Sequence, residues 1–408
     1  MSEEASQALT ETAVGDNDLQ AGRPLSADID LSAVTRNARA IKMLIGPECE
    51  LMAVVKANGY GLGASWMARA ALEGGATRLA VACVDEGVQL RREGITGPIL
   101  VMSYGSPSEA QAAVENGLTL AIHRTDIAAA LEAAASRVGL SQGQVPIHIK
   151  VDTGLGRFGC LPEELVPLAH YVNQSRHLRL EGLMTHFAEA DSQDTAFTRR
   201  QCSLFNELRA EAGRQGINFD VVHAANSSAM LSLPESRFDM VRVGIMLTGH
   251  YPSSHFKDAI KVEPAITIRT RLVRVFQVGE GESVGYGRTW VAARPSTIGL
   301  IPAGYADGYV RLLSNRGAVL VRGQRCPVAG RISMDQSAVD LTDVPGAQEG
   351  DEVVLVGKQA GAEITADEVA KWAETISYEL FTGIGGRVPR RYYRDGRLKA
   401  VCTLLGCS

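Results

Sequence analysis

The sequence lacks the features that mark secreted, membrane-spanning and zinc-stabilised proteins. Its seven cysteines include no CxxC pair, and a chain of 408 residues does not need disulfide staples, so we expect reduced thiols and no metal site. No apolar run is long enough to span a bilayer. The first residues are acidic and polar, without the basic start and the apolar stretch of a signal peptide. These absences predict a cytoplasmic protein that has no membrane partner.

An excess of charge of one sign is also missing. The 41 basic and 46 acidic residues give a formal net charge of -5, and no run of lysine or arginine could follow a phosphate backbone, which argues against nucleic acid as a partner. Hydrophobic residues make up 45% of the chain, so it can bury a large core and is not a disordered or purely structural protein. The polar start predicts a disordered tail over residues 1–22.

Short apolar, β-branched runs alternate with longer stretches of helical spacing over residues 32–258. Strands that are apolar on both faces belong in a parallel sheet covered by helices. Eight such units favour an α/β fold of the (β/α)8 barrel type, and a doubly wound open sheet is the alternative. The runs are LMAVVK (51–56), RLAVACV (78–84), PILVMS (98–103), LTLAIH (118–123), VPIHIKVD (145–152), LRLEGLMTH (178–186), FDVVHA (219–224) and MVRVGI (240–245).

The pattern changes over residues 259–408 to alternating strands separated by turns. This pattern is typical of a separate, mainly β domain, with one helix expected around residues 366–381. The segment RPLSADIDL (23–31) is expected to add a strand to this domain before the barrel begins.

Barrels of this type form their active site at the carboxyl ends of the strands, where Lys56 closes the first run. The turn-like ANGYGLG that follows would let the backbone approach a ligand closely. Among apolar walls, desolvation would lower the pKa of this amine and make it a nucleophile able to form a Schiff base. A lysine that merely extends from the barrel mouth into solvent is the alternative. Tyr60, in the same turn, is a candidate donor to a phosphate, or an ordinary loop tyrosine.

The loop after the fifth strand run presents a second group of polar residues. VDTGLGRFG follows Lys150 with Asp152 and a tight glycine turn that carries Arg157. The planar guanidinium suits a carboxylate such as that of an amino acid, although a loop arginine is more commonly just solvated.

Polar residues also follow the sixth and seventh strand runs. His186 ends the sixth run, and HAANSSAM supplies His223, Asn226 and Ser227. Two histidines could bind a metal, but no HxH pair and few carboxylates accompany them, so a ring packed beneath a flat cofactor suits His186 better. Ser227 and the amides near Gly244 follow strands seven and eight, where barrels commonly hold phosphate.

Arg242 lies inside the apolar run MVRVGI and must therefore find a partner or a ligand. A structural ion pair is one interpretation. If instead the arginine faces the ring nitrogen of pyridoxal phosphate, it keeps that nitrogen unprotonated and weakens the cofactor as an electron sink. In the second domain, PAGYADGYVR places Tyr305 in a turn, and AGRISMDQ places Met334 and Asp335 in another. Tyr305 could then supply a second base for racemisation.

Eight motifs together resemble those of the alanine racemase family, in order and across nearly the whole chain. They are AVVKANGYG, KVDTGLGRFG, THFAEAD, HAANSSA, MVRVGI, GYADG, GRISMDQ and GIGGRVPR. The resemblance implies a fold-type III pyridoxal phosphate enzyme, a homodimer with two shared active sites that interconverts L- and D-alanine for peptidoglycan. It also implies that Lys56 holds the cofactor and is the base on the D side, and that Tyr305 of the partner subunit is the base on the L side.

The resemblance assigns the remaining roles motif by motif. Tyr60, Ser227, Gly244 and Ile245 would hold the phosphate, and Asn226 would stand beside them. His186 would pack against the pyridine ring and Arg242 would contact its nitrogen. Arg157 would lie near the substrate carboxylate and would be held in place by Lys150, a lysine that is carbamylated in some relatives. Met334, next to Asp335, would donate its backbone N–H to the same carboxylate.

Two departures from the family pattern bear on the substrate. Many relatives have histidine at the position of Leu62, and some have tyrosine at the position of Gly386. A smaller residue near the substrate entrance would admit side chains larger than methyl, so serine or a broader range of amino acids is a further hypothesis. Another enzyme on the same architecture, a decarboxylase or an aldolase, and a noncatalytic cofactor-binding protein are the rival interpretations.

Overall fold

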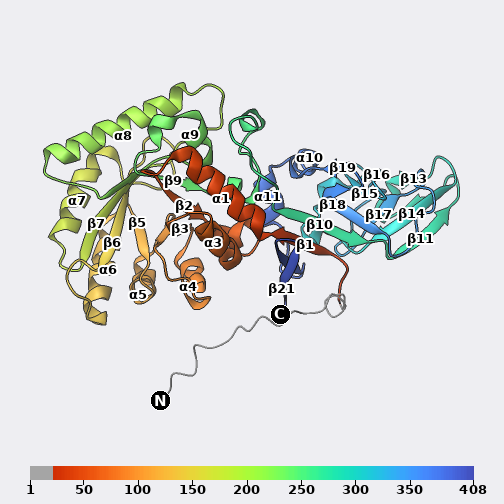
Figure 1. Ribbon diagram of the computed structural model, residues 1–408, viewed down its shortest axis with the longest axis horizontal. Coiled ribbons are helices and arrows are strands. Elements are labelled where there is room, and N and C mark those ends of the chain that lie inside the picture. Colours follow the sequence, from red (N-terminus) through yellow and green to blue (C-terminus); the bar gives the residue numbers. More distant parts are fainter. Residues whose placement is uncertain (1–21) are drawn as a thin grey trace, which may run out of the picture.

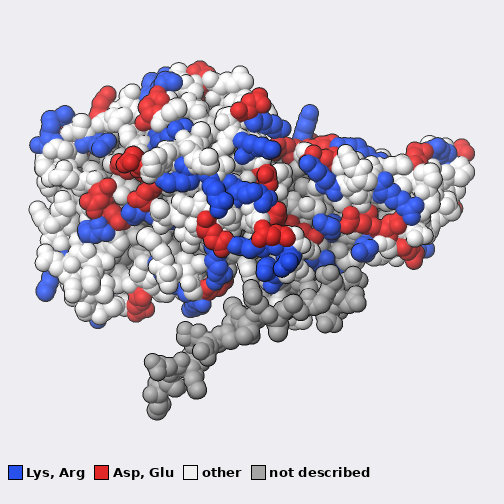
Figure 2. Space-filling model, viewed as in Figure 1, with Lys and Arg blue, Asp and Glu red and all other residues white. Residues whose placement is uncertain are grey.

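The computed structural model describes residues 22–408, so the predicted tail lies outside the described residues except for Gly22. Figure 1 shows two parts side by side along the long axis, a barrel with its helices on the left and a mainly β part on the right. Acidic and basic side chains are interspersed over the face in Figure 2. Among the described residues, no helix is both long enough and apolar enough to cross a membrane.

The first part is a nearly closed barrel of parallel strands. Within residues 22–408 its strand order is β8-β7-β6-β5-β4-β3-β2-β9, and all neighbours in this order are parallel. The Asp239 N–H donates to the Val222 carbonyl at 3.1 Å and brings the two end strands together. The predicted (β/α)8 architecture is therefore confirmed. The strands are β2 (Glu50–Val54), β3 (Arg78–Val81), β4 (Ile99–Val101), β5 (Thr119–Ile122), β6 (Val145–Lys150), β7 (Leu178–Met184), β8 (Val221–His223) and β9 (Met240–Val243).

Helices cover the outside of the barrel and bury one face each. In α6, for example, Ile127, Leu131 and Ala135 are buried at helical spacing, and Gly139 ends the helix in the left-handed conformation. Asp30 caps α1 by accepting the Ala33 N–H at 3.1 Å. The helices are α1 (Leu31–Ile45), α2 (Lys56–Tyr60), α3 (Ala64–Glu73), α4 (Val84–Arg92), α5 (Ala110–Glu115), α6 (Thr125–Val138), α7 (Leu165–Gln174), α8 (Ala196–Arg214) and α9 (Ser227–Ser232).

The second part is built on a large sheet in which β1 pairs antiparallel with β10 and parallel with β20. The strand that precedes the barrel thus lies inside the sheet that follows it, and the predicted mainly β domain is confirmed. The sheet contains β16 (Gln324–Pro327), β15 (Ala318–Val321), β18 (Glu352–Gln359), β10 (Ile266–Arg271), β1 (Ser26–Asp30), β20 (Arg390–Arg394), β21 (Arg397–Thr403) and β22 (Gly406–Cys407), with β19 (Ala362–Ile364) beside β18. Smaller sheets are formed by β11 (Arg274–Val278), β14 (Ser296–Ile301) and β17 (Ser337–Asp340), and by β12 (Ser283–Val284) and β13 (Trp290–Val291).

Two expectations about this part need correction. The helix expected around residues 366–381 is two helices, α10 (Ala366–Trp372) and α11 (Ser377–Thr382), because Glu374 between them takes a left-handed φ of 54°. The expectation that all cysteines are reduced is also wrong, since Cys402 and Cys407 form a disulfide. These two residues face each other in the β21–β22 hairpin register, which brings the sulfurs together. The other cysteines are free.

Candidate active site

Lys56 comes two residues after the end of the first barrel strand and begins an unusual left-handed turn. Residues 57–60 all have positive φ, between 51° and 61°, which costs roughly 1–2 kcal/mol for each residue that is not glycine. The Asn58 side chain holds the turn by accepting the Ala64 N–H at 3.0 Å. The Glu86 carboxylate accepts the Ala57 N–H at 2.6 Å. The strain is thus compensated by contacts that fix the direction in which the lysine leaves the strand.

Lys56 opens into a cavity of about 510 Å³ at the carboxyl ends of the strands. A cavity of this size is in the range of small-molecule and cofactor sites. The cavity brings together eight of the residues singled out in the sequence, from strands or turns far apart along the chain. They are Lys56, Tyr60, His186, Asn226, Ser227, Arg242, Gly244 and Ile245.

One end of this cavity has the form of an anion cradle. Tyr60 is buried, and its hydroxyl lies against Gly244, where a Cβ would come within 2.6 Å of the tyrosine Cε2. Asn226 caps α9 by accepting the Ala229 N–H at 2.9 Å, and Ser227 is the first residue of that helix. Proteins commonly bind phosphate with such groups: a hydroxyl, here that of Tyr60, the start of a helix, here α9, and backbone without a side chain, here Gly244.

The electrostatics of the cavity favour a neutral amine on Lys56. Burial lowers the pKa of this lysine, and the positive charges of Arg157 and Arg242 lower it further, while Glu86 partly opposes them. A neutral amine is the form that attacks a carbonyl. Burial and the charge of Arg242 also lower the pKa of Lys150, to about 8.

Arg242 is fully inside the barrel and pairs with no carboxylate among residues 22–408. Its guanidinium donates to Nδ1 of His223 at 3.0 Å and to Nδ1 of His186 at 3.0 Å. Burial and the charge of Arg157 lower the pKa of Arg242 to about 9, so that it stays protonated at neutral pH. Because the Arg242 guanidinium can only donate hydrogen bonds, Nδ1 of His223 and Nδ1 of His186 must both be unprotonated. This fixes the tautomer of each histidine.

The hydrogen bonds continue from Arg242 through the barrel interior. His223 Nε2 donates to His148 Nδ1 at 2.8 Å, and His148 Nε2 donates to the Glu181 carboxylate at 3.0 Å. Burial lowers the pKa of both histidines, which agrees with neutral rings. Glu181 also pairs with Arg78 at 3.2 Å. The direction of every bond in this chain is therefore set by the arginine at one end and the carboxylate at the other.

Arg157 lies in the exposed loop after β6, beside an adjoining hollow of about 720 Å³ that shares His186 and Asn226 with the first cavity. The Asp152 carboxylate shapes this loop by accepting the N–H of Gly154 at 2.8 Å and that of Arg157 at 3.0 Å. Arg157 thus lines the hollow next to the cavity of Lys56, and its positive charge lowers the pKa of that lysine.

Tyr305, Met334 and Asp335 do not line the cavity that holds Lys56. The turns that carry them are joined to each other, since the Tyr305 N–H donates to the Ser333 carbonyl at 3.1 Å. Tyr305 and Met334 are both exposed residues, at 41% and 52%. The single chain therefore presents two separate sets of predicted site residues, one in the barrel and one on the second domain.

The structure adds residues that sequence reasoning did not identify. Tyr378 of α11 lines both hollows, with its ring centre 6.1 Å from that of Tyr60. Helix α11 reaches the Lys56 turn because Gly61 has no side chain, and a Cβ there would come within 2.8 Å of the Phe381 carbonyl carbon. His148 and Glu181 are polar residues inside apolar strand runs. The argument that singled out Arg242 could have found them.

A half-buried lysine with a lowered pKa, an anion cradle and a deeply placed arginine are the groups that a barrel enzyme would use to bind a phosphate-bearing cofactor. The two histidines proposed as alternative metal ligands are hydrogen-bonded to Arg242. Within the described residues, no group of three or more His, Cys, Asp or Glu side chains could hold a metal ion.

Comparison with known proteins agrees with this class. The family model of the alanine racemase N-terminal domain matches residues 29–252, and that of the C-terminal domain matches residues 265–392. Alanine racemase of Symbiobacterium thermophilum is 46% identical over 375 residues, 92% of this chain and 98% of its own. Alanine racemase 2 of Bacillus subtilis is 43% identical, covering 93% and 98%.

Solved structures give the same result. The crystal structure of alanine racemase from Bacillus anthracis with bound L-Ala-P has a TM-score of 0.89 at 36% identity, covering 94% of this chain and 98% of that one. Alanine racemase from Streptomyces coelicolor has a TM-score of 0.84 at 39% identity, covering 90% and 98%. The chain therefore belongs to the alanine racemase family, whose members depend on pyridoxal phosphate.

Proposed function

We propose that this chain interconverts L- and D-alanine by a two-base mechanism in which Lys56 and Tyr305 act from opposite faces of the substrate. The observation that carries the proposal is the amine of Lys56, lowered in pKa and aimed into a cavity that ends in an anion cradle. Inversion requires a proton to leave one face of the α-carbon and another to arrive on the opposite face, so two opposed bases are needed.

The residues of the cavity fit pyridoxal phosphate. Tyr60, Ser227 and the backbone amides of Gly244 and Ile245 would hold the phosphate, and the missing side chain at Gly244 leaves room for the Tyr60 hydroxyl. When bound, the cofactor withdraws electrons from the α-carbon of the amino acid joined to it and makes the α-proton removable. Lys56 would hold the cofactor and then, as a neutral amine, take up or return the proton on the D side.

Arg242 limits the chemistry to proton exchange. A guanidinium donates a hydrogen bond but does not transfer its proton at neutral pH, so a ring nitrogen facing Arg242 would stay unprotonated. Decarboxylases and aldolases usually need a protonated ring nitrogen. The buried, hydrogen-bonded Arg242 therefore favours racemisation over these alternatives.

The remaining site residues are proposed to bind the substrate carboxylate. Arg157 lines the adjoining hollow with its loop shaped by Asp152, and Lys150 lies near it with its amine donating to the Met102 carbonyl at 3.3 Å. Met334 would supply its backbone N–H from the second domain, with Asp335 beside it.

A homodimer would complete the site. Tyr305 and Met334 are exposed on the second domain and absent from the cavity of Lys56, as expected if each chain supplies these residues to the other. A mixture of Lys56→Ala and Tyr305→Phe chains tests this arrangement together with both bases. Each variant alone should lose racemisation. A mixed dimer would contain one site with both bases intact, so random mixing should restore about a quarter of the wild-type activity.

Two outcomes would contradict the proposal. If mass measurement shows that mixed dimers form but racemisation activity does not return, both bases must act within one chain. Borohydride reduction of the loaded protein should fix the cofactor on the peptide that contains Lys56. An adduct on another peptide, or none, would remove Lys56 from its role. The noncatalytic alternative predicts that cofactor binds while neither enantiomer is converted.

A further inference from the structure

The strained turn that carries Lys56 is held at both ends by charged side chains from other parts of the molecule. We call residues 56–61 the lysine turn. Residues 57–60 have positive φ, and strained backbone of this kind persists only where the surrounding contacts determine it. Glu86 binds the N–H of Ala57 at the start of the lysine turn, and Arg390 binds the carbonyl of Gly61 at its end.

Glu86 lies in the first turn of α4 and binds two backbone N–H groups at once. Its Oε1 accepts the Ala57 N–H at 2.6 Å, and its Oε2 accepts the Ala82 N–H at 2.7 Å. Ala57 follows Lys56, and Ala82 follows β3, the strand that pairs with β2. Both side-chain positions must accept, which a carboxylate does and a carboxamide does not, because one of its two positions is a donor. Glu86 thus ties the start of the lysine turn to the end of the neighbouring strand.

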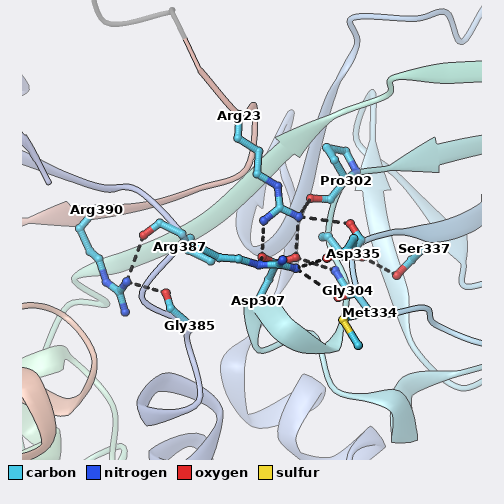
Figure 3. A network of polar contacts seen from close by, with 12 residues as sticks. Arg23, Pro302, Gly304, Asp307, Met334, Asp335, Ser337, Gly385, Arg387 and Arg390 are labelled. Atoms are coloured by element: carbon cyan, nitrogen blue, oxygen red, sulfur yellow. Dashed lines mark hydrogen bonds and ion pairs between the residues drawn. The ribbon is translucent and has the colours of Figure 1, made fainter. Parts of the chain in front are cut away.

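Arg390 holds the other end of the lysine turn from the second domain. It is the first residue of β20, is only 7% exposed and pairs with no carboxylate among residues 22–408. Its Nε donates to the Gly61 carbonyl at 3.2 Å. Figure 3 shows its guanidinium directed at the Gly385 carbonyl, apart from the arginine–aspartate pairs in the same view. Its other two nitrogens donate to carbonyls of the segment before β20, those of Ile384, Gly385 and Val388.

The backbone between these two contacts is short and closely packed. The Gly61 N–H donates to the Ala57 carbonyl at 2.9 Å, so the two ends of the lysine turn are also bonded to each other. Just beyond the turn, a Cβ on Gly63 would lie 2.9 Å from Cζ of Tyr392 in β20. A displacement at either end would therefore move the whole turn and, with it, the direction in which the Lys56 side chain leaves the backbone.

We infer that Glu86 and Arg390 are positioning residues for Lys56, which hold the two ends of the lysine turn and thereby fix the direction of its amine in the cavity. The inference rests on the proposed role of Lys56 as the residue that holds the cofactor and as the base on the D side. A misplacement of about 1 Å can cost on the order of 100-fold in rate. Loss of either contact should therefore slow proton transfer at Lys56 and leave the base on the opposite face unaffected.

The test uses the loaded, full-length enzyme with Glu86→Gln and Arg390→Met. We expect kcat for racemisation to fall about 10- to 100-fold in both variants, with less change in KM. Arg390→Lys should lose less, because lysine keeps the charge but can reach fewer of the four carbonyls. This variant carries the test of Arg390 if Arg390→Met does not fold.

Each variant has a matched control from the same element. Asp85→Asn removes an exposed carboxylate from the same turn of α4. Arg394→Met removes the pair that joins the end of β20 to Glu73 of α3, away from the lysine turn. Both controls should racemise alanine like the wild type.

Isotope effects assign the loss to one base. Because the two enantiomers are equally stable, kcat/KM must fall equally in both directions, and rates alone do not identify the affected base. With alanine deuterated at the α-carbon, Lys56 removes the label only from the D enantiomer. In Glu86→Gln and Arg390→Met the isotope effect on kcat/KM should therefore rise with D-alanine and fall with L-alanine.

Hydrogen-exchange mass spectrometry gives a readout besides activity. The peptide that contains residues 57–63 should lose protection in Glu86→Gln and Arg390→Met and keep it in both controls.

Three results would overturn the inference. One is a kcat of Glu86→Gln and of the folded Arg390 variants within twofold of the controls. Another is a loss of kcat with both isotope effects unchanged, which would indicate less active enzyme and not a misplaced lysine. The third is unchanged protection of residues 57–63. If Lys56→Ala itself racemises normally, the proposed function fails instead, and the two failures are thereby distinguished.

Discussion

The hydroxyl of Tyr60 lies directly over the α-carbon of Gly244, in the space that a side chain on Gly244 would occupy. The tyrosine comes from the left-handed turn after β2 and the glycine from the end of β9, and these two strands are neighbours in the barrel. The phosphate cradle is therefore built where the first and last strands meet.

Gly244→Ala should weaken cofactor binding by about tenfold or more, because the new methyl would displace the Tyr60 hydroxyl and occupy the cradle. Titration of the apoprotein with pyridoxal phosphate, followed by absorbance, measures the change. The control is Gly213→Ala in α8, where a Cβ would meet nothing within 4 Å. Equal affinities of the two variants would contradict the assignment of the cradle.

Glu181→Gln should alter the dependence of stability on pH. Burial opposes ionisation, but the hydrogen bonds and charges of His148 and Arg78 outweigh it and lower the pKa of Glu181 to about 2. A carboxyl with a depressed pKa stabilises the folded state above its ordinary pKa, and this stabilisation is lost as the pH falls from 4.5 toward 2.

The free energies of unfolding of wild type and Glu181→Gln should therefore differ by roughly 2–3 kcal/mol near pH 6 and converge as the pH falls toward 2. Urea unfolding at one protein concentration measures the difference. Glu211→Gln, which removes an exposed pair with Arg214, is the control and should show little effect at any pH. A gap for Glu181→Gln that stays constant with pH would contradict the prediction.

Lys150 should react with carbon dioxide to form a carbamate. With its pKa lowered to about 8, about half of this amine is neutral at pH 8, and conversion to an anion would relieve its repulsion from Arg242 and Arg157. A carbamate ¹³C signal should appear with labelled bicarbonate and increase from about pH 7 to pH 9. It should vanish in Lys150→Met and persist in Lys42→Met, a lysine that donates to three carbonyls. A signal that survives Lys150→Met would refute the assignment.

Gly386→Tyr should narrow the substrate range. Gly386 precedes Arg387, and among the described residues a Cβ there would have only Leu404 within 4 Å, at 3.8 Å, so the larger side chain can be accommodated. We expect kcat/KM for serine, lysine and arginine to fall about tenfold relative to alanine. Racemisation assays on all four amino acids provide the measurement. A wild-type enzyme active on alanine alone would reject the broader range.

The sequence was sufficient for the parts of the fold that depend on local pattern. Each apolar run predicted as a barrel strand overlaps an observed strand, because a strand buried on both faces leaves a continuous apolar signature. Arg242 could be singled out because a charge in such a run requires a partner. Its partners could not be named, since the chain from Arg242 through His223 to Glu181 depends on how strands β6 to β9 are staggered.

Features that depend on packing between distant segments were beyond sequence reasoning. Tyr378 reaches the cavity only because α11 rests on the turn at Gly61, a contact between residues more than 300 positions apart. The Cys402–Cys407 bond follows from the register of a short hairpin that the cysteine count does not reveal. Leu62, one of the two departures from the family pattern, is completely buried and does not line the cavity. The sequence alone could not reveal that this residue lies away from the cavity wall.

The place of β1 in the large sheet constrains the order in which the molecule can be made. Its two neighbours, β10 and β20, are synthesised only after the whole barrel, a delay on the order of tens of seconds at about 5–20 residues per second. Until β10 is made, both edges of β1 are unpaired beside a barrel that can already fold, and one edge stays unpaired until β20 is made. Newly made chains are therefore exposed to edge-to-edge association at this strand until β20 has been synthesised.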